Sequence, residues 1–205
     1  MAIETEARRQ AMGKAIVEFE GRYKDGKLQC YRLPPSDGGG AYEIAGINER
    51  YHPTKAAQLK SLIEGGHHEK AEAEAAAYIA EYTKSVCKFF PSQEAAEQNP
   101  AIEFLLRDTA FNRGAKGAAA VLQIALGMKD IDGIVGPLTH REFARQLADP
   151  GGPQLIAATL TQARETYERS VYPWKPNARD EKSKFWRGLS SRWTKAHEVG
   201  SSRFA

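Results

Sequence analysis

The sequence predicts a mainly α-helical protein with one small non-helical lobe after its first helix. Over most of the 205 residues, apolar side chains recur three and four positions apart, which is the spacing of one helix face. The stretch 22–50 differs, because the turn-forming pairs Asp25-Gly26 and Pro34-Pro35 and the glycine run Gly38–Gly40 interrupt short segments. These observations favour helices built around a hairpin-like insertion.

The first helix is expected over residues 5–20, with Gly21 as its stop. Its apolar row consists of Met12, Ala15, Ile16 and Phe19. Apolar spacing, prolines and glycines predict seven further helices, at about 54–64, 71–88, 100–113, 116–126, 137–147, 155–167 and 180–197.

Composition describes an ordinary folded chain. Hydrophobic residues are 41% and charged residues 27%, and 29 Lys and Arg against 26 Asp and Glu give a formal charge of +3. This mild excess permits a polyanionic partner without indicating nucleic acid. The longest charge-free runs, 150–163 and 117–128, fall short of the roughly 18 apolar residues of a membrane-spanning helix, so no transmembrane segment is expected.

The N-terminus lacks the uninterrupted apolar stretch of a secretory signal, because acidic and basic side chains are spread over residues 4–20. We therefore expect synthesis in the cytoplasm without a signal peptide. The two cysteines, Cys30 and Cys87, form neither a disulfide framework nor a metal-ligand pair, and reduced thiols are expected.

No metal or cofactor is expected. The segment Asp130–Gly133 is similar to the start of a calcium loop, but the twelfth position is Arg141 and not the Glu that such a loop requires. His67 and His68 are neighbours on a helix start, point in different directions and lack a third ligand. Nucleotide-binding motifs are absent from the sequence.

Glu20 is the first candidate for a catalytic group. It extends the apolar row of its helix, four residues after Ile16 and eight after Met12, so its carboxyl group is expected to be partly desolvated. It also lies at the helix C-terminus, where the helix dipole disfavours negative charge. Both effects favour the protonated form that a general acid needs. The alternative is a solvated carboxylate on a frayed last turn.

A second carboxylate is expected from the lobe. Asp37 and Glu43 flank the run Gly38–Gly40, and an acid facing a helix-end Glu is the arrangement that glycoside hydrolysis uses. Spacing does not choose between the two. Each also has a structural alternative, Asp37 as a turn residue and Glu43 as a surface strand residue.

Cations and aromatics alternate near the C-terminus, at 184–187 and at Arg192-Trp193. Such a segment could stack on sugars or on bases, which leaves nucleic-acid binding as a third possibility for function. Trp and Phe at helical spacing are also typical core anchors.

A series of motifs over roughly residues 10–195 resembles one known family. Residues 20–23 read E-G-R-Y, near the signature E-G-G-Y; Gly39-Gly40 with 45–47 and 51–53 is similar to D-P-G-G-x-T-N-Y-G-I and the Tyr-Pro after it. Further matches in order and spacing lie at 107–114, 119–127, 131–139 and 185–192, the last against F-x-x-G-W-x-x-R. These are the motifs of glycoside hydrolase family 108, N-acetylmuramidases first described as secretion activators, and of their peptidoglycan-binding region.

The resemblance implies a lysozyme-like, mainly helical fold. It implies a catalytic region at 1–98, a peptidoglycan-binding helical region at 99–197 packed into the same globule, and a flexible tail at 198–205. Glu20 matches the family's catalytic glutamate, the proton donor to the β-1,4 bond after N-acetylmuramic acid. The residues expected to contact the substrate are Tyr23, Tyr42, Asn48, Asp108 and Asn112. For the last two, four apart on one helix face, buried hydrogen-bonding struts are the alternative.

The chain departs from the family pattern within the lobe. Arg22 replaces the second Gly of E-G-G-Y, and Gly38 replaces the Pro of D-P-G-G. The link 41–45 is one residue longer than usual and lacks Thr-Asn, and Leu189 stands in place of the Trp of the closing motif. Glu43 is therefore expected to be the working carboxylate of a divergent subgroup. The alternative is a catalytically inactive module that binds peptidoglycan and positions partners at the wall.

The expected function is that of a monomeric N-acetylmuramidase that uses no cofactor and has peptidoglycan strands, not nucleic acid, as its partner. It would act in the periplasm or cell wall, as a phage-type endolysin or as a wall-remodelling enzyme of a secretion system. Because no signal is expected, export would use a holin-type or dedicated route.

Overall fold

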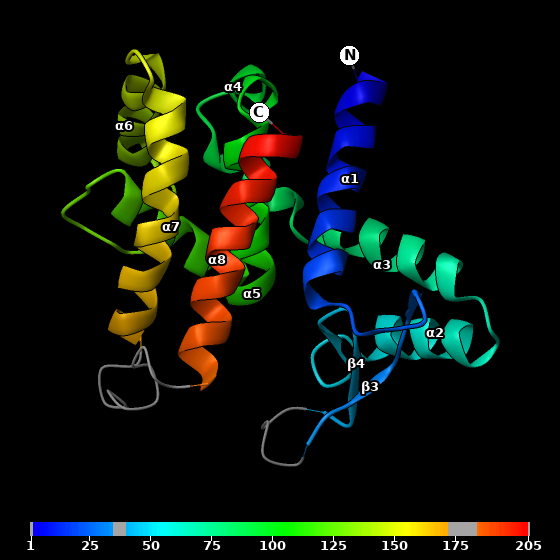
Figure 1. The fold of residues 1–205 in the computed structure, drawn as a ribbon. Helices are drawn as coiled ribbons and strands as arrows, with labels where there is room; N and C mark the ends of the chain where they lie inside the picture. The colour runs from blue at the N-terminus through cyan, green and yellow to red at the C-terminus, as the bar shows by residue number, and fades with distance from the viewer. Residues whose placement is uncertain (1, 35–39, 172–183, 205) are drawn as a thin grey trace. The chain divides into compact units, whose positions relative to one another are not determined.

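The computed structural model describes residues 2–34, 40–171 and 184–204. These form two compact units, Met1–Tyr82 and Thr83–Ala205. Both are mainly helical, and small antiparallel sheets follow the first helix (Figure 1). The predicted fold class, mainly α with a small lobe after the first helix, is confirmed.

In the first unit, α1 (Ala2–Glu20) packs against α3 (His68–Tyr82). Gly13 permits the close approach, because a Cβ at this position would lie 2.2 Å from the carbonyl oxygen of Ala76. The apolar row expected on α1 is largely buried, since Met12 and Ile16 are fully covered. The helix ends at Glu20, as predicted, and the Gly21 amide donates to the carbonyl oxygen of Val17 at 2.7 Å.

The lobe consists of two small sheets. In the first, β1 (Tyr23–Lys24) pairs with β2 (Lys27–Leu28) through a turn in which Asp25 and Gly26 both have positive φ, as a tight hairpin requires. The second has the strand order β3-β4-β5 and comprises β3 (Tyr31–Arg32), β4 (Tyr42–Ile44) and β5 (Ile47–Asn48). Helix α2 (Pro53–Glu64) packs against β4 and β5, whose paired residues Ile44 and Ile47 are fully buried.

The second unit is organised around its longest helix, α5 (Pro100–Ala125), against which η2, α4, α7 and α8 pack. The other elements are η2 (Lys84–Phe89, a 3-10 helix), α4 (Gln93–Gln98), α6 (Pro137–Ala148), α7 (Gly152–Val171) and α8 (Lys184–Arg203). Gly114 interrupts α5 with φ 70° and ψ 170°, which confirms the break expected between the two sequence-predicted helices.

Two helix ends and one additional helix differ from expectation. Helix α3 stops at Tyr82 and a 3-10 helix follows, where the apolar period predicted a helix to about residue 88. Helix α4 was not predicted; the Ser92 hydroxyl caps it by accepting from the Ala95 amide at 3.1 Å. At the C-terminus, α8 continues through Arg203, where a tail was expected, because the buried Phe204 ring packs 4.9 Å from that of Phe104.

Candidate functional site

Glu20 occupies the last position of α1, and its side chain is partly buried. The exit from the helix needs a glycine, because a Cβ on Gly21 would lie 2.5 Å from Cε2 of Tyr23 and 2.8 Å from the carbonyl oxygen of Val17. The chain therefore turns sharply into the lobe directly after the candidate acid.

Glu43 is the centre of a row of three residues that crosses the second sheet. Tyr31 of β3 and Asn48 of β5 are its direct cross-strand neighbours. Cross-strand partners point to the same face of a sheet, so Tyr31, Glu43 and Asn48 share one face. The opposite face includes the buried Ile44 and Ile47. The partly buried Glu43 side chain thus lies on the face away from the sheet's apolar packing.

Asn48 and Glu49 lie against the end of the glycine-rich segment, and Glu49 bonds to it. The Asn48 side-chain oxygen accepts from the Arg50 amide at 2.8 Å, and it would lie 2.5 Å from a Cβ on Gly40, whose φ is 70°. A carboxylate oxygen of Glu49 accepts from the Ala41 amide at 3.2 Å. A side chain at position 40 would therefore displace the Asn48 contact. Asp37, the other candidate acid, lies outside the described residues.

Arg22 links the exit of α1 to the row. Its guanidinium carbon lies 5.3 Å from the centroid of the Tyr31 ring. Arg22 follows Glu20 by two positions and Tyr31 faces Glu43 across the strands. The cation–π contact therefore joins the segment that carries the candidate acid to the strand pair that carries the second carboxylate.

Two expected substrate contacts of the first unit, Tyr23 and Tyr42, lie outside this row. Tyr42 alternates with Glu43 on β4 and so points to the opposite face, where the Lys60 ammonium of α2 lies 4.8 Å from its ring centroid. Tyr23 hydrogen-bonds to Glu72 of α3; burial, the Glu72 and Glu18 carboxylates and this hydrogen bond raise the pKa of Tyr23 to about 12. The structure does not gather these two tyrosines with the row that contains Glu43.

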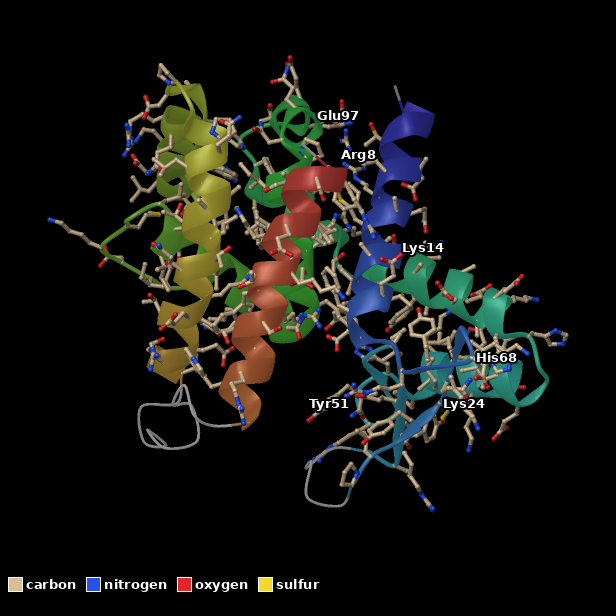
Figure 2. The ribbon with its side chains drawn as sticks, viewed as in Figure 1. Arg8, Lys14, Lys24, Tyr51, His68 and Glu97 are labelled. Atoms are coloured by element: carbon tan, nitrogen blue, oxygen red, sulfur yellow. The ribbon has the colours of Figure 1, made fainter. Side chains whose placement is uncertain are left out.

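His68 (Figure 2) has a structural contact in place of a metal ligand role. Its Nδ1 donates to the carbonyl oxygen of Leu28 at 2.8 Å, which ties the β1–β2 hairpin to the start of α3. Among the described residues, no three or more His, Cys, Asp and Glu side chains gather closely enough to hold a metal ion.

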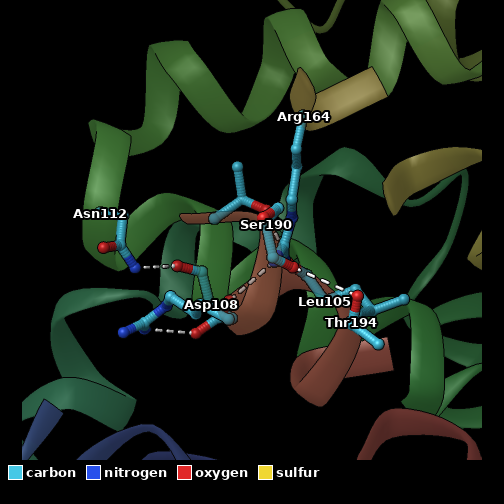
Figure 3. A network of polar contacts seen from close by, with 8 residues as sticks. Leu105, Asp108, Asn112, Arg164, Ser190 and Thr194 are labelled. Atoms are coloured by element: carbon cyan, nitrogen blue, oxygen red, sulfur yellow. Dashed lines mark hydrogen bonds and ion pairs between the residues drawn. The ribbon is translucent and has the colours of Figure 1, made fainter. Parts of the chain in front are cut away.

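Asp108 belongs to the second unit and is 1% exposed on α5. Its carboxylate accepts from Arg164 of α7 at 2.8 Å and from Arg192 of α8 at 2.6 Å (Figure 3). Burial alone would raise the pKa of Asp108, but Arg192 and Arg164 outweigh it and hold the pKa below its usual value. Of the two roles expected for Asp108, this geometry fits the structural one, because the buried carboxylate joins α5 to α7 and α8.

Asn112 lies one turn further along α5. Its amide donates to the backbone carbonyl oxygen of Asp108 at 2.9 Å. The side chain also lines a cavity of about 20 Å³ together with Asp108, Arg164, Tyr167 and Trp193. A cavity of this size holds about one water molecule. Both candidate residues of the second unit therefore belong to one polar network, in which Asp108 is buried and Asn112 is partly buried.

A second buried network escaped the sequence analysis. Arg107, 1% exposed, donates to Glu103 at 2.8 Å, to the Thr83 hydroxyl at 3.0 Å and to the Cys87 sulfur at 3.2 Å. The one sequence signal for it is the four-residue spacing of Glu103 and Arg107 on a helix. Thr83 and Cys87 come from outside that helix, so periodicity could not identify them.

The tryptophans of α8 are core anchors, as one of the two interpretations predicted. Trp186 is 3% and Trp193 7% exposed, and their rings meet edge to face with centroids 5.6 Å apart. In the part of the chain that the structure describes, no helix is both long enough and apolar enough to cross a membrane.

Comparison with known proteins adds one finding about the fold. No protein-family model matches this sequence, and no curated protein matches it either. Among solved structures, that of Brucella abortus SagA is similar, with a TM-score of 0.56 and 21% sequence identity over 97% of this chain and 95% of that chain. At this identity the likeness concerns the fold alone, and it agrees with the lysozyme-like helical fold predicted from the sequence.

Proposed function

We propose that the protein is a peptidoglycan hydrolase, an N-acetylmuramidase related to glycoside hydrolase family 108. It would cleave the β-1,4 bond between N-acetylmuramic acid and N-acetylglucosamine. The observation that carries the proposal is Glu20, a partly buried carboxyl residue at the end of α1, directly before a glycine-dependent turn into the lobe that holds Glu43. The similarity in fold to SagA over nearly the whole chain supports it.

In the proposed mechanism, Glu20 protonates the glycosidic oxygen, and the bond from that oxygen to the anomeric carbon breaks as the N-acetylglucosamine side leaves as an alcohol. Glu43 stabilises the positive charge that develops on the sugar ring or activates the water that adds to the anomeric carbon. A carboxylate separation of roughly 5 Å favours retention, and one of 6.5 to 9.5 Å favours inversion. Asp37 stays the competing candidate for the second role.

We extend the proposal to the second unit, whose helices would bind the cell wall. The Asp108 network would act there by holding α5, α7 and α8 together. On this proposal the protein acts as a monomer in the periplasm or cell wall, after holin-type or dedicated export.

The changed lobe favours one alternative, a catalytically inactive peptidoglycan-binding module. The link 41–45 is longer than in the family and Arg22 stands where the family has glycine. Nucleic-acid binding is less well supported, because the two tryptophans that could stack on bases are buried in α8.

The test uses purified insoluble peptidoglycan, with mass spectrometry of released muropeptides and assay of new reducing ends. We expect wild type to release products ending at N-acetylmuramic acid and Glu20→Gln to lose activity by about a hundredfold or more. Glu18→Gln, two positions earlier on the same helix, is the matched control and should retain activity. Full activity in Glu20→Gln would contradict the assigned acid, and binding without any product from wild type would favour the inactive module.

A further inference from the structure

Arg22 is an exposed cation that an aromatic ring holds in place. Its guanidinium carbon lies 5.3 Å from the Tyr31 ring centroid, and no described residue accepts a hydrogen bond from its side chain. A guanidinium group on a ring face keeps its N–H donors available, and the contact limits the rotamers that the free side chain samples. The donors are therefore partly preorganised for an outside acceptor.

The position of Arg22 places these donors beside the proposed reaction site. Tyr31, on which the guanidinium group rests, is the cross-strand neighbour of Glu43. Tyr31 is itself 39% exposed, so this face of the strand pair is open to a polymer. A substrate reaching Glu43 would meet a cation with unused donors on the neighbouring tyrosine ring.

We propose that Arg22 binds a carboxylate carried by the glycan or by its attached peptide and so selects acidic over uncharged β-1,4-linked glycans. The proposal rests on the glycan-cleaving function proposed above. A guanidinium group can donate two parallel hydrogen bonds to one carboxylate, which gives both affinity and orientation. Arg22 is thus a specificity residue for the polymer and takes no part in proton transfer.

Arg32 provides a matched control on β3, the strand of Tyr31. It directly follows Tyr31, is exposed, and pairs with Tyr42 on the other face of the sheet. Its charge equals that of Arg22, so a general electrostatic attraction between protein and polymer would respond equally to loss of either residue. If Arg22 specifically recognises the polymer, loss of Arg22 weakens binding and loss of Arg32 does not.

The experiment measures co-sedimentation of the full chain carrying Glu20→Gln, so that binding is separated from cleavage. Two insoluble polymers serve as direct probes, intact peptidoglycan and uncharged chitin. Soluble glycan strands stripped of peptides by an amidase serve as competitors for binding to peptidoglycan. Adding Arg22→Gln should weaken binding to peptidoglycan by about tenfold, and to chitin by no more than about twofold. Arg22→Lys should fall between, and Arg32→Gln should change each affinity by less than about twofold.

The stripped strands separate the two sources of a carboxylate. In intact peptidoglycan the lactyl group of a peptide-bearing sugar is an amide, and the amidase frees it as a carboxylate while it removes the stem peptide. If the Arg22 effect disappears on stripped strands, the stem peptide supplies the acceptor; if it persists or grows, a lactyl carboxylate on peptide-free sugars can serve. Equal losses for Arg22→Gln and Arg32→Gln, equal losses on chitin and peptidoglycan, or no binding to any polymer would overturn the inference. Muropeptide release by wild type is measured separately, so its absence contradicts the proposed function and not the binding result. Matching circular dichroism and melting temperatures show that the variants fold.

Discussion

Tyr31 and Glu43 face each other on neighbouring antiparallel strands, and the side chain of Arg22 covers the tyrosine ring from the segment that leaves α1. Three parts of the chain separated in sequence thus converge on one strand pair of the first unit. On the proposed mechanism, this pair carries the second carboxylate and the contacts that orient the glycan. The role of Glu43 can be tested against that of its neighbour Glu49.

We predict that Glu43→Gln lowers the rate of reducing-end release from peptidoglycan by about a hundredfold or more, since it removes the charge that the transition state needs. Glu49→Gln is the control. It keeps an oxygen that can accept the hydrogen bond from the Ala41 amide, and it should retain most of the rate. If Glu43→Gln is as active as Glu49→Gln, Asp37 and not Glu43 supplies the second catalytic carboxylate.

Gly13→Ala should destabilise the first unit by about 2 kcal/mol or more, because the new Cβ would collide with the Ala76 carbonyl group and force α1 and α3 apart. Gly188→Ala, on an open side of α8, has no atom within 4 Å of its new Cβ and should stabilise its helix by up to about 1 kcal/mol. Chemical denaturation of both variants measures the two signs. A neutral Gly13→Ala would mean that the α1–α3 contact is less tight than described.

Much of the helical fold was predictable because its signals are local. The apolar row and Gly21 predicted the end of α1, and Gly114 predicted the break in α5. The end of α3 was not predictable, because Arg107 of α5 binds Thr83, which precedes the 3-10 helix, and Cys87 within it. Phe204 likewise extends α8 through a ring contact with Phe104. These contact partners are distant in sequence, so the spacing of apolar residues along the chain does not reveal them.

The candidate site was predictable to a smaller extent. The position of Glu20 at a helix end followed from the sequence, but the row of Tyr31, Glu43 and Asn48 depends on strand register. Strands of two or three residues carry too little alternation to set a register. The contact between Arg22 and Tyr31 depends on that register as well, so it could only be seen in three dimensions.

Asp108→Asn should cost the second unit about 3 kcal/mol or more at pH 7, because it leaves the buried guanidinium group of Arg164 and the partly buried one of Arg192 without their carboxylate. The native pKa of Asp108 lies below its unfolded value of about 3.9, so its contribution is complete above that pH and is lost as the pH falls towards the native pKa. The difference in unfolding free energy between wild type and variant should therefore shrink below about pH 4.

The control for Asp108 is Asp149→Asn. Asp149 pairs with Arg145 at the surface, with 58% and 56% of the Arg145 and Asp149 side chains exposed, so its loss should cost less than about 1 kcal/mol. Denaturation curves at neutral and acidic pH provide the comparison. A cost at Asp108 that is the same at both pH values would show that packing, and not the buried ion pairs, accounts for its effect.

Tyr23 should titrate unusually high and should respond to one particular carboxylate. Burial, the Glu72 and Glu18 charges and the hydrogen bond to Glu72 raise its pKa to about 12. Glu72→Gln removes a negative charge, so the pKa of Tyr23 should fall towards the ordinary value of about 10. Because the native pKa exceeds the unfolded one, the neutral phenol contributes stability that is complete below about pH 10 and is lost as the pH rises through the native value. NMR titration of the labelled tyrosine ring measures this shift.

The control is Glu69→Gln, three positions earlier on α3, which should leave the pKa of Tyr23 close to its wild-type value. Equal shifts in the two variants would show that a general negative field, and not the Glu72 contact, sets the pKa.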